Sequence, residues 1–213
     1  MSQRTEESCD YCKEFELESL VLNQRDYGNR IILESENYVV FPALGPIVPG
    51  NLLITSKAHY VGMTAIPQSL YEELEDLKEK VRKKITEKYE APFFFEHGEV
   101  SEKKRAACCI DHAHLQVIPA GVDQEVVKDL ERRFRMRRII EYRELRENRE
   151  KEVPYIFVET REGIRYVFNV PDILASQYVR QIIAIKIGQP ERWDWRNNYR
   201  IEEMGIAVER LRG

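Results

Sequence analysis

The N-terminal part of the chain alternates short apolar runs with polar turns. The runs "RIILES" (30–35) and "YVVFPA" (38–43) are rich in β-branched and aromatic residues, and polar residues separate them. A third apolar run, "NLLIT" (51–55), follows the Pro and Gly punctuation of residues 45–50. This pattern predicts a β-hairpin followed by a core strand.

A helical period replaces this pattern over residues 67–88. Such a period predicts an amphipathic helix, with Pro67 near its start and lysines near its end. The apolar side chains that recur at spacings of four, three, four and four residues are Leu70, Leu74, Leu77, Val81 and Ile85.

Two further strands are predicted on either side of a polar loop. The strands are "PFFFEH" (92–97) and "CIDHAHLQVIP" (109–119), and the loop covers residues 98–107. A hairpin, a strand, a long helix and two more strands predict an α+β domain with a mostly antiparallel sheet. We assign this domain to residues 1–121.

Residues 122–213 are interpreted as a C-terminal extension. Segment 131–151 carries eight arginines and one lysine. It favours a solvated helix with i,i+4 ion pairs, with a basic surface that meets phosphates as the alternative. Residues 155–170 predict a hairpin, and residues 172–188 predict a helix closed by Gly188. Because no Ser/Gly/Pro-rich linker precedes it, we expect an α/β extension packed on the first domain.

Composition narrows the class of protein. The chain has 213 residues, of which 43% are apolar, and its net charge of −4 argues against a general nucleic-acid binder. No apolar run approaches the ~20 residues of a membrane span. The N-terminal residues lack the apolar core of a secretory signal, so we expect a cytoplasmic protein. Its cysteines are then thiols or metal ligands rather than disulfides.

Three polar residues occupy alternate positions of the last predicted strand of the first domain. His112, His114 and Gln116 would therefore share one face, while the residues between them form an apolar face. In a helix the same positions would diverge, so a shared site requires the strand. The spacing alone leaves open a solvated sheet face, a metal site and a catalytic site.

Several blocks of the sequence, in order, resemble the histidine triad superfamily. "HAHLQVIP" resembles its signature, "VPGNLLITSKAH" its proline, glycine, lysine and histidine block, "FFFEHG" its penultimate strand, and "CDYC" its N-terminal cysteine pair. Gln116 stands where most members have a third histidine. This departure is similar to the branch of galactose-1-phosphate uridylyltransferase and the diadenosine tetraphosphate phosphorylases.

The resemblance implies that His114 is the nucleophile. Its ring would attack the α-phosphorus of a nucleotide ester or anhydride, and water or an acceptor phosphate would release the nucleotide. A main-chain carbonyl of the same strand would bind the other ring nitrogen. We expect Gln116 to donate from its amide to a phosphate oxygen, and we hypothesise that this favours transfer over hydrolysis. His112 completes the catalytic motif.

The nucleotide is expected near Asn51, Gly50, Glu96 and Cys109, although a simple turn also explains Gly50. The implied substrate is a dinucleoside polyphosphate or a nucleoside diphosphate sugar. The resemblance also implies a possible homodimer that pairs through the long helix and an edge strand.

A zinc site is predicted at the N-terminus. Cys9 and Cys12 form a C-x-x-C pair that can place two thiolates on one zinc ion. By resemblance, His59 and His112 supply the other two ligands of a structural site. A redox role is disfavoured because no βαβ pattern surrounds the pair.

Alternatives to a nucleotidyltransferase or phosphorylase remain open. They are a nucleotide hydrolase, a nucleotide-binding regulatory module, and a metalloenzyme in which His112 and His114 bind a catalytic ion. His97 is either near the pocket or on the surface. Trp193 and Trp195 either cap a nucleoside or subunit contact, or anchor the C-terminal segment.

Overall fold

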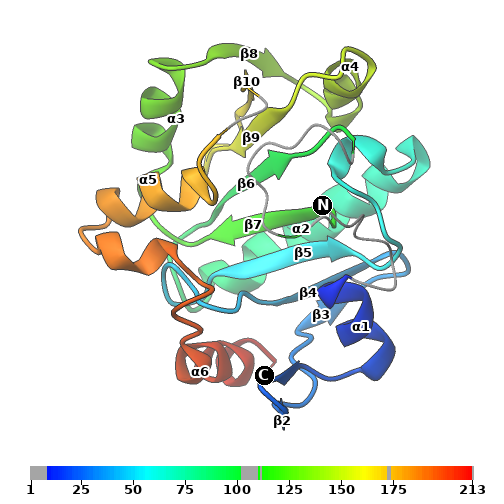
Figure 1. Ribbon diagram of the computed structural model, residues 1–213, viewed down its shortest axis with the longest axis vertical. Helices are drawn as coiled ribbons and strands as arrows, with labels where there is room; N and C mark the ends of the chain where they lie inside the picture. The colour runs from blue at the N-terminus through cyan, green and yellow to red at the C-terminus, as the bar shows by residue number, and fades with distance from the viewer. Residues whose placement is uncertain (1–8, 102–109, 111, 172–173, 213) are drawn as a thin grey trace.

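The computed structural model describes residues 9–101, 110, 112–171 and 174–212. Their centre is an eight-stranded sheet, ordered β3-β4-β5-β7-β6-β9-β10-β8, with all neighbours antiparallel (Figure 1). The α+β class with an antiparallel sheet is therefore confirmed. The strands of the described residues are β1 (Val21–Leu22), β2 (Arg25–Asp26), β3 (Leu33–Glu34), β4 (Tyr38–Pro42), β5 (Leu52–Ser56), β6 (Phe93–Gly98), β7 (His114–Ile118), β8 (Arg135–Ile139), β9 (Tyr155–Glu159) and β10 (Arg165–Asn169).

Helices cover this sheet and close its ends. The helix predicted over residues 67–88 is confirmed, as a 3-10 turn followed by α2, and no helix in the described part of the chain is long and apolar enough to cross a membrane. The α-helices are α1 (Asp10–Leu17), α2 (Tyr71–Thr86), α3 (Asp123–Glu131), α4 (Arg146–Glu150), α5 (Tyr178–Lys186) and α6 (Ile201–Arg212). The 3-10 turns are η2 (Met63–Ala65), η3 (Gln68–Leu70), η4 (Tyr142–Leu145) and η5 (Pro190–Trp193).

Helix α2 covers one face of the sheet. Its buried residues Leu74, Leu77 and Val81 belong to the largest apolar cluster, which also contains Leu115 and Val117 of β7. These are the apolar positions that alternate with His114 and Gln116, so the predicted apolar face of this strand is confirmed.

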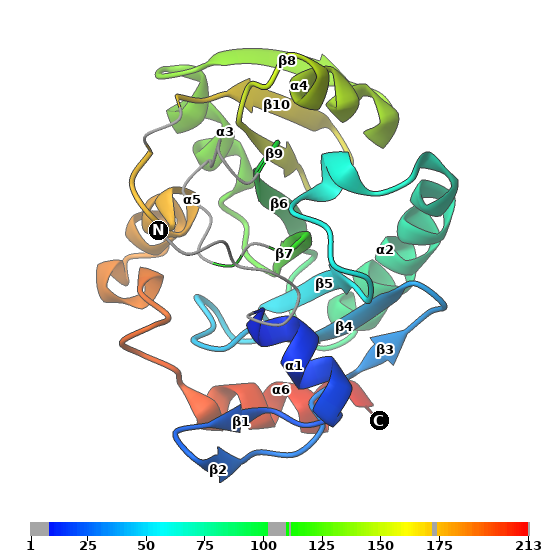
Figure 2. The same cartoon turned by 45° about the vertical axis from the view of Figure 1, so that its right-hand side comes forward.

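The opposite face carries two separate apolar clusters. One contains residues of α3 and α5 with β6, β9 and β10, and the other contains residues of α1 with β4 and β5. Figures 1 and 2 show α1 and α5 apart from each other on the side away from α2. Strand β7 lies between the two clusters, and its polar face is therefore only partly covered.

The strands after residue 121 continue the same sheet. β9 pairs with the outer edge of β6, and β10 and β8 follow, so the predicted hairpin over residues 155–170 is confirmed. The open edges of this sheet, within the described residues, are β3 and β8. The domain boundary at residue 121 and the homodimer stay predictions.

Two predictions in the extension were wrong in part. Residues 135–139 form the edge strand β8 rather than a helix, because Met136 and Ile139 pack into clusters on opposite faces of the sheet. Pairing with β10 thus overrides local helical propensity. The helix predicted over residues 172–188 begins only at Tyr178, but Gly188, with φ of 72°, follows its end as predicted.

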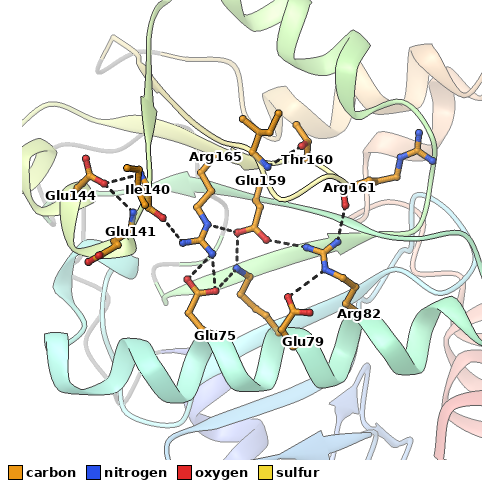
Figure 3. A network of polar contacts seen from close by, with 12 residues as sticks. Glu75, Glu79, Arg82, Ile140, Glu141, Glu144, Glu159, Thr160, Arg161 and Arg165 are labelled. Atoms are coloured by element: carbon orange, nitrogen blue, oxygen red, sulfur yellow. Dashed lines mark hydrogen bonds and ion pairs between the residues drawn. The ribbon is translucent and has the colours of Figure 1, made fainter.

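A network of charged side chains joins α2 to β9 and β10 (Figure 3). The Glu159 carboxylate lies 2.6 Å from Lys78 Nζ and 2.8 Å from Arg165 Nε. Glu75 contacts the same two cations, at 3.0 and 2.7 Å, and Arg82 contacts Glu159 at 2.9 Å. Lys78 is fully buried, so its charge is balanced inside the protein.

Candidate functional site

A group of polar residues interrupts the face of the sheet between α1 and α5. In β6 and β7 all residues are buried except His97, His114 and Gln116, which are half-buried. Gln116 pairs with Phe95 across the two strands, and residues two apart in a strand share a face. These three side chains, the polar patch, therefore lie together on the face opposite α2.

His114 is held in one ring orientation by the main chain. Its Nδ1–H donates to the carbonyl oxygen of His112 at 2.7 Å, the kind of partner that the resemblance implies. The other nitrogen, Nε2, therefore keeps its lone pair. Burial lowers the pKa of His114 and outweighs the effect of this hydrogen bond. A neutral ring with one fixed proton can act as a nucleophile.

Asn51 orients Gln116. Its Nδ2 donates to Oε1 of Gln116 and to the carbonyl of Val117, both at 3.2 Å, and its Oδ1 accepts from the amide of Ile47. Because Oε1 of Gln116 already accepts from Asn51, the amide nitrogen of Gln116 is the atom left to donate to a ligand. Asn51 itself is buried, so it acts on a ligand only through Gln116.

Four metal-binding side chains converge beside the polar patch. Sγ of Cys9 lies 3.4 Å from Nδ1 of His112, and Sγ of Cys12 lies 3.4 Å from Nδ1 of His59. The four donor atoms all lie within 4.8 Å of one another. In a tetrahedral zinc site with ordinary bond lengths, neighbouring sulfur and nitrogen ligands are about 3.5 Å apart. Cys9, Cys12, His59 and His112 therefore fit a metal ion.

The ring of His112 faces the two cysteines, and the residue itself lies just before β7. We expected it within the strand, but β7 begins at His114, because the amide of His112 bonds to Ile110 in a turn. Its Nε2–H donates to the carbonyl of Ser56 at 2.7 Å, so Nδ1 faces the sulfurs without a proton. Burial lowers the pKa of His112 to about 4, which keeps the ring neutral.

Helix α1 brings the cysteines to the sheet. Cys9 immediately precedes this helix and Cys12 lies in its first turn. The carboxylate of Glu14 accepts two hydrogen bonds from buried Arg30, at 2.6 and 2.7 Å. The guanidinium of Arg30 lies 4.4 Å from the ring centroid of Phe41 in β4. This contact fixes the helix over β4 and thereby the position of both thiols.

A cavity of about 490 Å³ adjoins Gln116. Leu44 and Leu53 contribute apolar surface, while Arg180 and Trp195 reach it from the C-terminal extension. Ligand pockets commonly have this size and combine apolar walls with a few polar groups. Its lining thus includes an aromatic ring, from Trp195, and a cation, from Arg180.

Arg180 fixes the extension against this cavity. It is buried, and it donates to the carbonyl of Trp193 at 2.8 Å and to that of Gly45 at 2.7 Å. Gly45 has φ of 66°, and a Cβ there would lie 2.6 Å from the backbone of Trp195 and Asn198. Sequence reasoning missed Arg180, because an arginine in an amphipathic helix gives no local sign of burial.

Of the four residues expected at the nucleotide, Glu96 and Gly50 are not brought to the polar patch. Glu96 lies on the α2 face, where its carboxylate accepts from the amide of Met63 at 2.7 Å and the hydroxyl of Tyr155 at 2.6 Å. Gly50 lies in a turn with φ of 80°, where a Cβ would clash with a neighbouring ring. Cys109 lies outside the described residues.

His97 belongs to the polar patch, a placement that the sequence left undecided. Its Nε2 accepts the amide hydrogen of Val179, in the first turn of α5, at 3.1 Å. Burial lowers the pKa of His97 to about 3, so the ring is neutral. The alternation of Phe93, Phe95 and His97 along β6 is the signal that could have placed it on the face of Gln116.

Comparison with known sequences finds one distant relative. No family model matches the chain. The zinc finger CCCH domain-containing protein 59 of Oryza sativa subsp. japonica is 24% identical over 212 residues, which cover 92% of this chain. The chain spans 32% of the length of that protein.

Solved structures give a second comparison. A hypothetical histidine triad nucleotide-binding protein from Sulfolobus tokodaii has a TM-score of 0.42 and 18% identity, covering 53% of this chain and 68% of its own. A Zn-bound histidine triad family protein from Mycobacterium smegmatis has a TM-score of 0.43 and 19% identity, covering 54% of this chain and 76% of its own. A HIT family hydrolase from Clostridium thermocellum has a TM-score of 0.41 and 20% identity, covering 55% of this chain and 93% of its own. Each of these three histidine triad or HIT family structures matches about half of this chain.

Proposed function

We propose that the chain is a nucleotide-processing enzyme of the histidine triad superfamily that works through a covalent nucleotidyl-His114 intermediate. The observation that carries this proposal is the 2.7 Å hydrogen bond from Nδ1 of His114 to the carbonyl of His112. It leaves Nε2 as a nucleophile in a half-buried position, two residues before Gln116, which lines the cavity.

The reaction has two displacements at one phosphorus. In the first, Nε2 of His114 attacks the α-phosphorus, a P–N bond forms, and the bond to the leaving-group oxygen breaks with its electron pair on that oxygen. In the second, an acceptor oxygen attacks, the P–N bond breaks, and its electron pair returns to His114. The ring is thereby regenerated.

Gln116 and the cavity supply binding. The amide nitrogen of Gln116, directed by Asn51, would donate to a non-bridging oxygen of the α-phosphate. The cavity would take the nucleoside against Leu53 and Trp195. A dinucleoside polyphosphate or a nucleoside diphosphate sugar fits this arrangement, because each joins a nucleoside to a leaving group through a phosphate anhydride.

The acceptor distinguishes a transferase from a hydrolase. Hydrolysis uses the same intermediate, with water as the second nucleophile, and is the alternative function. An amide cannot take a proton from water, so Gln116 supports an acceptor that is already ionised, such as phosphate.

We also propose that the metal held by Cys9, Cys12, His59 and His112 is a structural zinc ion. A site with four protein ligands has no open position for substrate, so zinc would supply stability rather than chemistry. Because the carbonyl of His112 accepts the hydrogen bond from His114, fixing His112 also fixes the ring of the nucleophile.

Intact-protein mass spectrometry tests this function. The full chain is mixed with dinucleoside polyphosphates and nucleoside diphosphate sugars, with His114→Ala as the control. We expect a nucleotide-sized mass increase in the wild type that is absent from the variant. Added inorganic phosphate should then give a nucleoside diphosphate, whereas a hydrolase would give a nucleoside monophosphate. An adduct that persists in His114→Ala, or a wild type without adduct or product, contradicts the proposal.

A further inference from the structure

We infer that His97 is a second binding residue for the reacting phosphoryl group and donates a hydrogen bond to it from Nδ1. We further infer that α5 fixes the ring in the state required for this role. The inference rests on the proposed function of His114. It adds a residue from β6 that lies outside the histidine-containing motif.

The sheet brings His97 and His114 together at the adjacent ends of β6 and β7. Phe95 of β6 lies opposite Gln116 of β7, and the strands are antiparallel. Continuing this register by two residues in each strand places His97 opposite His114, on the same face. The paired ladder ends at Phe95 and Gln116, and beyond it the two rings lie close enough for the charge of His114 to contribute to the lowered pKa of His97. His97 therefore borders the nucleophile.

The hydrogen bond to α5 selects one tautomer of the His97 ring. The amide of Val179 can only donate, so Nε2 of His97 must be the unprotonated nitrogen in their 3.1 Å hydrogen bond. The single proton of the neutral ring is then on Nδ1. As long as α5 holds Nε2, the ring presents a donor at Nδ1.

The ring of His97 is more accessible than its neighbours in β6. His97 is half-buried, while its neighbours Glu96 and Gly98 are buried. Among the described residues, no hydrogen-bond partner of Nδ1 of His97 is found, and the same holds for Nε2 of His114. Within the described structure, both nitrogens are therefore left for a ligand on this face of the sheet.

The chemistry needs such a donor. Negative charge is spread over three oxygens of a phosphoryl group in transfer, and donors placed around it stabilise the transition state. Gln116 provides one donor from β7, and His97 would provide another from β6. A neutral imidazole can serve this purpose without giving up its proton.

Two substitutions separate this role from a purely structural one. In His97→Asn the side-chain amide occupies the place of Nδ1, so a donor remains while the bond to Val179 is lost. In His97→Gln the amide reaches the place of Nε2, so the bond to Val179 can remain while the donor at Nδ1 is lost. We expect adduct formation with diadenosine tetraphosphate to slow about 100-fold in His97→Gln and to stay within about tenfold of wild type in His97→Asn. The reverse order, or equal rates, would overturn the inference.

A measurement that needs no turnover separates failure of this inference from failure of the proposed function. Nitrogen-15 NMR of the histidine rings reports the tautomer of His97, and inorganic phosphate serves as the probe. We expect an Nδ1-protonated ring whose resonances shift as phosphate is added. A wild type without adduct or product refutes nucleotidyl transfer, and the NMR titration still decides the role of His97. An Nε2-protonated ring, or no shift with phosphate, overturns the inference.

Discussion

Two groups of polar side chains lie on opposite faces of the same sheet and differ in how their hydrogen-bonding atoms are used. In the ion-pair network under α2, Lys78, Arg165 and Glu159 satisfy one another away from water. Burial alone would raise the pKa of Glu159, but the charges of Lys78 and Arg165 outweigh it and hold the pKa below its ordinary value. Glu159 is therefore held as the anion, and the network serves the fold.

The two histidine rings of the polar patch are neutral, and in each of its three side chains one polar atom has a hydrogen-bond partner within the protein. Nδ1 of His114, Oε1 of Gln116 and Nε2 of His97 each have a partner within the protein. For the second atom of each group, no hydrogen bond to the rest of the described structure is found. Groups that are anchored by one atom and leave the other for a ligand are expected at functional sites. In these two groups, the fraction of polar atoms that have a partner within the protein distinguishes the structural residues from the functional ones better than burial does.

Removing the metal should have the largest effect on stability and on adduct formation. The metal ligand His112 also accepts the hydrogen bond that holds the ring of His114. We expect about one zinc ion per chain, and we expect its loss in Cys12→Ser or with a chelator to lower the thermal unfolding temperature strongly. Structural zinc sites have apparent binding free energies on the order of 10 kcal/mol. Adduct formation should fall in parallel. Metal analysis and thermal unfolding check this.

Zinc added back is the control for this prediction. It should restore the chelated wild type but not Cys12→Ser. A chelated wild type that unfolds at an unchanged temperature would show that the four side chains hold together without metal, and that the patch has no need of it.

Breaking the network should cost stability but leave the chemistry intact. In Glu159→Gln, buried Lys78 keeps only Glu75 as an acidic partner, and removing one member of a buried ion pair typically costs about 3–5 kcal/mol. The matched control is Glu147→Gln, which removes the exposed ion pair with Lys151 and should cost about 1 kcal/mol or less. Urea unfolding measures both variants.

Adduct formation per folded molecule should remain at the wild-type level in Glu159→Gln, since no residue of the polar patch contacts the network. A Glu159→Gln variant as stable as Glu147→Gln would mean that Arg82, Arg165 and solvent rearrange to satisfy Lys78. A loss of adduct formation at full folding would remove the distinction between the two faces.

Local periodicity predicted the elements whose sequence carries a clear pattern. Helix α2 and the hairpin of β9 and β10 are examples, because their apolar positions alone decide which face is buried. The spacing of His114 and Gln116 likewise placed them on one face. The convergence of Cys9 and His59, by contrast, came from resemblance, since they are far apart in sequence and only the fold brings them together.

Long-range contacts explain what the sequence did not reveal. Lys78 lies in the run "KEKVRKK", which reads as a solvated helix surface, yet it is fully buried because β9 and β10 cover it. Arg180 is buried for a similar reason, through contacts with the loop around Gly45. The strand β8 was missed because its arginines suit an exposed helix as well as an edge strand.

Two buried glutamates on the α2 face, Glu96 and Glu159, differ in the charge that we expect them to carry in the folded protein. Glu96 differs from Glu159 because its hydrogen-bond partners, the amide of Met63 and the hydroxyl of Tyr155, carry no charge. Burial raises the pKa of Glu96 to about 7, and these two hydrogen bonds only reduce that effect. We therefore expect Glu96 to be protonated in the folded protein, whereas Glu159 is ionised.

This difference has a definite sign in the pH dependence of stability. The folded chain holds the proton of Glu96 to a higher pH than the unfolded chain, whose pKa is near 4.5. The contribution is fully present below pH 4.5 and is lost as pH rises through about 7, on the order of 3 kcal/mol in all. Glu96→Gln is permanently neutral and should lack this loss. Urea unfolding of both proteins across this interval should therefore show the wild type losing stability relative to the variant as pH rises. Parallel curves would mean that Glu96 is ionised in the folded protein, with a counter-charge like that of Glu159.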